Sequence, residues 1–305
     1  MISISTSTGA FFERSRADIK SLRGQAEALQ QQLSSGNQLS RSSDNPVAAS
    51  RLRALSRLDA LSQVDTANAD RASADLTLAG GAMSDMADAI VRAQELATQA
   101  ASSTLTGDQR SAIAAELDQL HGNLLALSNA RDSNGHALFG GEGTGDAYAL
   151  DAAGKATYVG SAQVEELPLG EGQSVSRSMS GPQFLSFTGK GGTATDVMGT
   201  IKALSDALKA GPGTASAIDA LADLKTGLDT LTTGQTVIGS RLNWIEVTTD
   251  RRTAMGELRS SEQADIGGAD LATTVTRLQE TLTVLEASQA SFSRLASLSL
   301  FDQLR

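Results

Sequence analysis

The residue types that most often carry catalysis are scarce in this chain of 305 residues. It has no cysteine, which excludes thiolate nucleophiles, disulfides and cysteine-ligated metal sites. Its two histidines, His121 and His136, stand in no catalytic or metal-binding motif. We expect His121 to lie at the surface or edge of a helix and His136 to lie in a turn. The sequence therefore predicts no enzymatic activity, no catalytic residue, no metal site and no cofactor.

Two glycine-rich segments and a row of aspartates also carry no clear chemistry. Residues 140–145 lack the Lys-Ser/Thr pair of a phosphate-binding loop, and residues 189–192 have no glycine at the required offset. Asp65, Asp70 and Asp75 step by five positions, which spreads them around a helix instead of directing them at one metal ion. We interpret the first segment as a linker and the aspartates as a solvated face.

Composition and charge narrow the classes of partner. The chain has 25 Lys and Arg against 35 Asp and Glu, a net charge of −10, so it is a poor candidate for binding nucleic acid. Residues 1–33 contain no apolar run of signal-peptide length, and no window approaches 18 continuous apolar residues. We therefore expect no membrane span, and either a cytoplasmic protein or export without a cleaved signal.

Heptad periodicity near both ends indicates helices that need a partner. Apolar residues recur at alternating spacings of three and four, and a short helix with such a seam is marginal alone. We predict that these residues form an assembly interface between helices. They are Ile19, Leu22, Ala26, Leu29 and Leu33 near the N-terminus, and Val275, Leu278, Leu282, Leu285 and Phe292 near the C-terminus.

Between the heptads, the sequence predicts a helical rod interrupted by a β-rich segment. Asp44 or Asn45 can cap a helix that has Pro46 at its first position and runs over about 47–103. A third helix follows and ends near Asn134. Residues 135–199 hold 14 of the 29 glycines, with a hairpin expected at 147–159. Helical pattern then resumes at 197 and continues to about 261.

The predicted fold is mainly α, with the N- and C-terminal halves forming a long antiparallel helical rod or coiled-coil hairpin. A small β-rich domain is inserted in its middle. We divide the chain into terminal helices for assembly (1–45 plus 265–305), a rod (46–138 plus 197–264) and an inserted domain (139–196). Met83 and Met86 are expected in the core of the rod. The adjacent Phe11 and Phe12 favour contact with another subunit.

Several short motifs, in their order and spacing, resemble the flagellin superfamily of bacterial flagella. Each motif is weak alone, but together they cover nearly the whole chain. They lie at residues 33–36, 43–49, 134–141, 158–160, 270–272, 285–288 and 298–304. Pro46-Val47-Ala48 stands where flagellins usually have Ala-Ala-Gly, so the chain is more similar to the superfamily's hook–filament junction proteins. Asn45 departs from the usual second Asp and leaves capping intact.

The resemblance implies a structural adaptor at the hook–filament junction, needed for filament assembly and motility; the alternative is flagellin itself. It implies hook-associated protein 1 and flagellin as axial neighbours, and further copies of the chain in a ring. It also implies an export chaperone, export through the flagellar type III channel and an extracellular location in the flagellum. The terminal heptads would then pair in the axial tube. An enzyme or ligand-binding protein with its site in the insert is a weaker alternative, because the insert has few aromatic residues.

Overall fold

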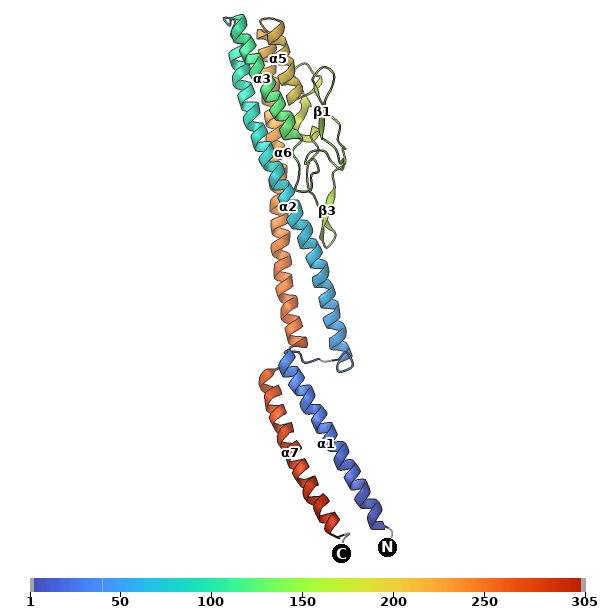
Figure 1. The fold of residues 1–305 in the computed structure, drawn as a ribbon. Coiled ribbons are helices and arrows are strands. Elements are labelled where there is room, and N and C mark those ends of the chain that lie inside the picture. Colours follow the sequence, from blue (N-terminus) through green and yellow to red (C-terminus); the bar gives the residue numbers. More distant parts are fainter. Residues whose placement is uncertain (1–2, 40, 303–305) are drawn as a thin grey trace. The chain divides into compact units, whose positions relative to one another are not determined.

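The computed structural model describes residues 3–39 and 41–302, and helices dominate them (Figure 1). The helices are α1 (Ser3–Ser35), α2 (Pro46–Ala100), α3 (Gly107–Ser128), α4 (Pro182–Leu185), α5 (Val197–Ala210), α6 (Thr214–Gly267) and α7 (Leu271–Asp302). The strands are β1 (Tyr148–Leu150), β2 (Ala156–Tyr158), β3 (Glu166–Gly170), β4 (Gln173–Ser176), β5 (Ser186–Thr188) and β6 (Ala194–Asp196). The predicted mainly α fold with a small inserted β region is confirmed.

The chain divides into two compact units. The terminal unit consists of Met1–Ala60 and Ala254–Arg305, and the central unit consists of Leu61–Thr253. The helices α2 and α6 contribute residues to both units. Each unit therefore contains segments from both halves of the chain.

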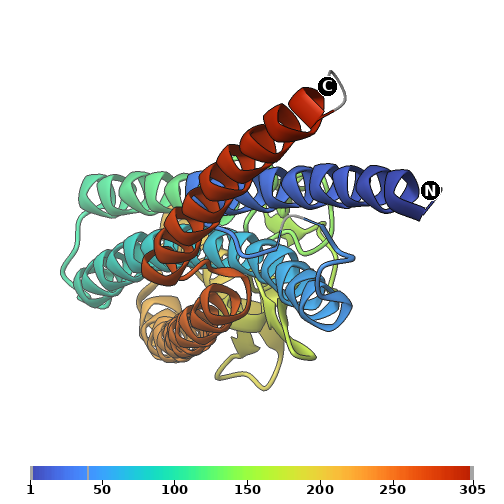
Figure 2. The same ribbon diagram turned by 90° about the horizontal axis from the view of Figure 1, so that it is seen from below.

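In the terminal unit, α1 pairs with α7 in antiparallel orientation (Figure 1). Where the two helices meet, the amide of Gln38 donates to the carbonyl of Gly267 at 2.7 Å, and the amide of Ala269 donates to the carbonyl of Gly36 at 2.9 Å. Seen from below, α1 and α7 cross at an angle (Figure 2). These backbone bonds tie the end of α1 to the start of α7.

Short polar side chains start the helices where the sequence suggested. The side chain of Asn45 accepts a hydrogen bond from the amide of Ala48 at 3.1 Å, one residue before Pro46 opens α2. Thr106 and Gln109 form a reciprocal capping box at the start of α3. Asp196 caps α5, and Asp270 accepts from the amides of the first turn of α7. Capping satisfies amides that the helices leave without partners.

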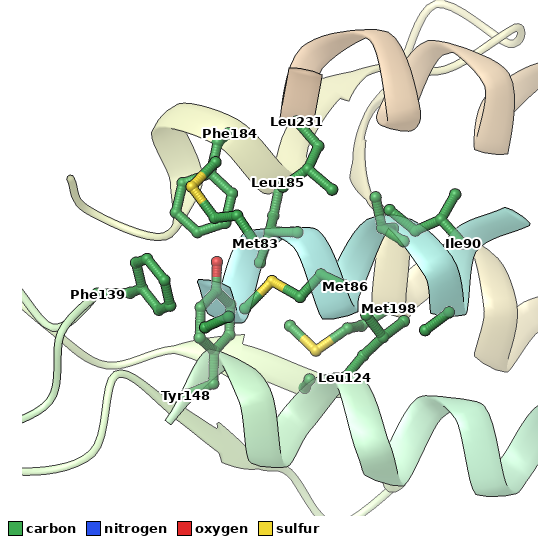
Figure 3. Packing of buried hydrophobic residues seen from close by; sticks show 14 of the residues in the cluster. Met83, Met86, Ile90, Leu124, Phe139, Tyr148, Phe184, Leu185, Met198 and Leu231 are labelled. Carbon is green, nitrogen blue, oxygen red and sulfur yellow. The ribbon is translucent and has the colours of Figure 1, made fainter. Parts of the chain in front are cut away.

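The core of the central unit lies where α2, α3, α5 and α6 meet the inserted segment (Figure 3). Met83 and Met86 of α2 are fully buried, so their expected place in the core is confirmed. The rings of Phe139 and Phe184, both from the inserted segment, lie 4.9 Å apart between centroids and are also fully buried. The core thus holds the inserted segment against the helices.

The inserted segment forms antiparallel pairs β1–β2, β3–β4 and β5–β6 instead of one sheet. The predicted hairpin is confirmed as β1–β2, and its turn is held by the carboxylate of Asp151, which accepts from the amides of Ala153 and Lys155. Gly154 takes a positive φ of 75° in this turn, a conformation that favours glycine. A break at residues 211–213 separates α5 from α6, which the periodicity alone had merged.

Within residues 3–39 and 41–302, no helix is both long and apolar enough to cross a bilayer.

Candidate assembly interface

The face of α1 that is turned away from solvent follows a heptad repeat. Its partly or fully buried residues include Phe12, Ser15, Ile19, Leu22, Ala26, Leu29 and Leu33, at alternating spacings of three and four. The matching face of α7 includes Thr274, Leu278, Thr281, Leu285, Ser288 and Phe292. Ala26, Thr274 and Leu285 are the most buried of these side chains. The arrangement is that of a coiled-coil seam between antiparallel helices.

The structure brings together most of the residues predicted for the interface. The five α1 residues all lie on the buried face, as do Leu278, Leu285 and Phe292 of α7. Val275 and Leu282 do not, because 41% and 42% of their surfaces are exposed. Thr274 and Thr281 occupy the seam positions beside them. Whether Val275 and Leu282 take part in assembly stays a prediction.

The phase of the α7 seam was misjudged because α7 carries two neighbouring apolar rows. Val275 and Leu282 stand a heptad apart and form one row, and Leu278, Leu285 and Phe292, also a heptad apart, form the other. Leu278 and Leu285 form an alternating repeat of three and four either with Val275 and Leu282 or with Thr274 and Thr281, and the sequence pattern favours the combination that is apolar throughout. In the structure, α1 covers only the second row, which leaves apolar surface on the flank of α7.

An aromatic contact joins α1 and α7 near the N-terminal end of α1 and the C-terminal part of α7. The rings of Phe12 and Phe292 meet edge to face, with centroids 5.4 Å apart. Phe11 stands next to Phe12 with ring centroids 5.9 Å apart, but 47% of its surface is exposed. The pair expected to contact another subunit is therefore split, with Phe12 used inside the chain and Phe11 left on the surface.

In the same unit, ion pairs join α2 to α6. The guanidinium of Arg51 forms a bidentate ion pair with the carboxylate of Glu262, with Nε donating to Oε1 at 2.5 Å and Nη2 donating to Oε2 at 2.8 Å. Asp59 accepts from Arg259 at 2.7 Å and from Gln263 at 2.6 Å, and these hydrogen bonds lower the pKa of Asp59. Leu55 lies buried between these polar contacts along α2. These contacts join α2 to α6 within the terminal unit.

In the central unit, a buried charge cluster corrects the view of Asp75 as solvated. Asp75 of α2 is 3% exposed and lies 3.4 Å from the guanidinium of Arg177, which also lies 3.3 Å from Asp132. Burial raises the pKa of Asp75 although the charge of Arg177 acts in the opposite direction. Burial would also raise the pKa of Asp132, but backbone hydrogen bonds from His136 and Asn134 outweigh it and lower that pKa.

One of the two histidines also differs from expectation. His121 is only 6% exposed, so its expected place at a surface or edge is wrong, and its Nε2 has no hydrogen-bond partner. Burial lowers the pKa of His121, and the nearby Lys202 lowers it further. His136 lies in a turn as expected, with Nδ1 3.6 Å from the carboxylate of Asp132. Among the described residues, no group of three His, Asp or Glu side chains could hold a metal ion.

Comparison with known proteins shows similarity to axial proteins of the bacterial flagellum. The model of the bacterial flagellin N-terminal helical region matches residues 7–144. Flagellar hook-associated protein 3 of Escherichia coli K12 is 27% identical over 97% of this chain and 98% of its own length. Residues 7–144 thus match the N-terminal helical region of bacterial flagellins, and nearly the whole chain is similar to a flagellar hook-associated protein. These similarities support a structural role in the bacterial flagellum, and the full-length similarity favours a hook-associated protein over a flagellin.

Solved structures of flagellar hook-associated proteins share the fold. A flagellar hook-associated protein from Vibrio parahaemolyticus superposes with a TM-score of 0.67, covering 74% of this chain and 100% of that one at 21% identity. Hook-associated protein 3 from Legionella pneumophila superposes with a TM-score of 0.64, covering 70% of this chain and 98% of that one at 14% identity. The chain thus shares its fold with these two hook-associated proteins.

Proposed function

We propose that this chain is the adaptor of the hook–filament junction. It joins hook-associated protein 1 on the hook side to the first flagellin subunits on the filament side. A ring of its own copies forms that layer of the axial tube. The observation that carries this proposal is the similarity to hook-associated protein 3, which extends over 97% of this chain and nearly the whole of that protein.

The assembly residues proposed for this role are the heptad residues of the terminal unit. The pairing of Leu22, Leu29 and Leu285 removes apolar surface from water, and a fully buried leucine contributes about 1.5–3 kcal/mol. The row that α1 leaves uncovered, which includes Val275 and Leu282, supplies further apolar surface on the flank of α7. A neighbouring subunit in the tube would cover this row.

The remaining parts receive roles that follow from this arrangement. Residues 1–45 and 265–305 assemble the tube, residues 46–138 and 197–264 form the rod, and residues 139–196 form the inserted domain at the surface. Export proceeds through the flagellar type III apparatus with the help of an export chaperone. The absence of cysteine suits a chain that threads through this channel and folds outside the cell. We propose no catalytic role.

Deleting the gene in its own host tests this function. We expect cells with hooks but without filaments by electron microscopy, and flagellin released into the medium. A copy of the wild-type gene should restore filaments and motility. Quantitative mass spectrometry of purified flagella separates the two roles within the superfamily, because a junction protein is a minor component and flagellin forms the bulk of the filament. Filaments of normal length in the deletion strain would contradict the proposal.

A further inference from the structure

The β3–β4 hairpin, which extends beside the long helices (Figure 1), ends in a turn that touches both α2 and α6. The side-chain amide of Asn68, on α2, donates to the carbonyl of Pro168 at 3.0 Å. The guanidinium of Arg252, on α6, donates to the carbonyl of Leu169. Leu169 is 1% exposed, so the strand that leads into the turn is anchored in the core. The turn therefore bridges two helices that come from opposite halves of the chain.

At the level of this turn, α2 and α6 have little apolar packing of their own. None of residues 61–68 and 246–253 is fully buried. The partly buried residues of these two stretches are all polar: Ser62, Asp65, Thr66, Asn68, Thr248, Thr249 and Arg252. Paired helices gain most of their stability from buried apolar faces. Side chains of α2 and α6 alone therefore hold this part of the helix pair weakly.

Carboxylates of the two helices also oppose their pairing. Asp70 of α2 lines a groove of about 550 Å³ between the helices together with Glu246 and Asp250 of α6, and no lysine or arginine lines it. Like charges that face one another across a groove repel. Asp70 and Asp250 each stand two positions from the helix residue that holds the turn. The repulsion therefore acts on the same helical turns that the hairpin joins.

The docked turn is itself under strain. Glu171 has a φ of 53°, the only positive φ of a non-glycine residue within residues 3–39 and 41–302. Its ion pair with Arg251 is exposed and contributes little to holding this conformation. The Nη1 of Arg252 is buried without a hydrogen-bond partner, which is unfavourable as well. Few contacts thus hold the turn in place against strain and repulsion, and such regions open locally before the core does.

We infer that the β3–β4 turn, residues 168–172, is a latch on the α2–α6 pair. When it is docked, it keeps residues 61–70 of α2 paired with residues 246–253 of α6 against the repulsion of their carboxylates. When it is released, these helical turns separate while the core around Met83 stays folded. Every contact of the latch lies within the central unit, so the inference does not depend on the proposed function.

Amide hydrogen exchange of the purified full-length chain, followed by mass spectrometry, tests the latch. Arg252→Met combined with Asn68→Ala removes both hydrogen bonds to the turn. Exchange in residues 61–70 and 246–253 should become about tenfold faster, the effect expected from losing a hydrogen bond to a charged group. Exchange in residues 83–97, in the core part of α2, should stay as in the wild type.

Glycine substitutions open the latch by a second route and supply its control. A Cβ at Gly170, which has a φ of 87°, would overlap the carboxylate of Asp65, so Gly170→Ala should also speed exchange in residues 61–70. Gly192 has a φ of 74° in the turn of the β5–β6 hairpin, and a Cβ there would meet no atom within 4 Å. Gly192→Ala therefore strains a turn in the same way without touching α2 and should leave that exchange unchanged.

Removing the repulsion gives a readout that simple loss of packing would not. Glu246→Gln with Asp250→Asn, added to the Arg252→Met and Asn68→Ala chain, should return exchange in residues 61–70 most of the way to the wild-type rate. A failure to recover would overturn the inference, because the latch would then oppose no repulsion.

Two further outcomes would overturn the inference. Wild-type exchange in both latch variants would show that the turn holds nothing in place. Faster exchange in residues 83–97 as well would show that the turn is an integral part of the core. A variant that circular dichroism shows to be unfolded is replaced by Asn68→Ala alone, which removes a single bond and is scored by the same two regions.

Discussion

The ring of Phe12 on α1 meets the ring of Phe292 on α7 edge to face, 5.4 Å apart between centroids, although 280 residues separate them in the sequence. This contact joins the two ends of the chain within one unit. It also marks the place where loss of a single side chain should weaken the seam without affecting the central unit.

Replacing Phe292 by alanine should loosen the pairing of α1 and α7. Aromatic pairs contribute about 0.5–1.5 kcal/mol beyond the area they bury, and the half-buried ring adds its own burial. We expect faster amide hydrogen exchange in residues 10–35 and fewer filaments in cells. Ser293→Ala, which changes an exposed neighbour, is the matched control. Unchanged hydrogen exchange in α1 would show that the aromatic contact does not hold the seam.

Removing the partly buried Arg177, which pairs with two buried aspartates, should destabilise the central unit strongly. Arg177→Met leaves Asp75 and Asp132 buried without their partner, and loss of one member of a buried pair costs about 3–5 kcal/mol. Thermal unfolding followed by circular dichroism should show a lower melting temperature. Glu165→Gln is the control, since this partner of Arg177 is half exposed and its pair is worth less than about 1 kcal/mol. Equal melting temperatures for the two variants would contradict this account.

The burial of His121 predicts a pH dependence of stability. Its pKa is depressed in the folded state, so its stabilising contribution is present above its ordinary pKa of 6.5 and is lost as the pH falls below that value. Urea unfolding at pH 7.5 and 5.5 should show that the free energy of unfolding of the wild type falls at the lower pH. The fall should be smaller in His121→Leu. His136→Gln, which keeps His121, should retain the wild-type dependence. The same loss in all three proteins would exclude His121 as its source.

Two glycines of α6 should respond to alanine in opposite directions. A Cβ at Gly234 would come within 2.8 Å of both the Met83 and Phe184 side chains, so Gly234→Ala should lower the melting temperature. A Cβ at Gly239 would have no atom within 4 Å, so Gly239→Ala should stabilise the helix by about 0.5–1 kcal/mol. Scanning calorimetry of the two variants measures both effects. A higher melting temperature for Gly234→Ala would contradict this prediction and would show that the Met83 and Phe184 side chains can shift to accommodate the added methyl group.

Much of the fold follows from local signals. Asn45 and Pro46 indicate the start of α2, and Asp151 with Gly154 indicates the β1–β2 turn. These residues can be recognised in the sequence because each acts on backbone groups a few positions away. The Gly-Pro-Gly sequence at 211–213 was an equally local signal for the break between α5 and α6. Periodicity outweighed it in our interpretation, although proline rarely continues a helix.

The rest depends on contacts that no local pattern encodes. Asp75 is buried because Arg177 reaches it from 102 positions away, and three aspartates spaced five residues apart cannot reveal that partner. His121 is buried because α5 packs against α3. The phase of the α7 seam depends on which of two apolar rows α1 covers, so a choice between Leu282 and Thr281 requires the partner helix to be known.

The most direct test of the account is to place a charge in the seam. Leu285 is 9% exposed on the face of α7 toward α1, so Leu285→Asp would bury a carboxylate without a partner. Expressed in the deletion strain, the variant should be synthesised and exported with a normally melting central unit, yet leave hooks without filaments by electron microscopy. The exposed Gln279→Asp should assemble like the wild type. Normal filaments from the Leu285→Asp protein would contradict the claim that the terminal helices assemble the junction.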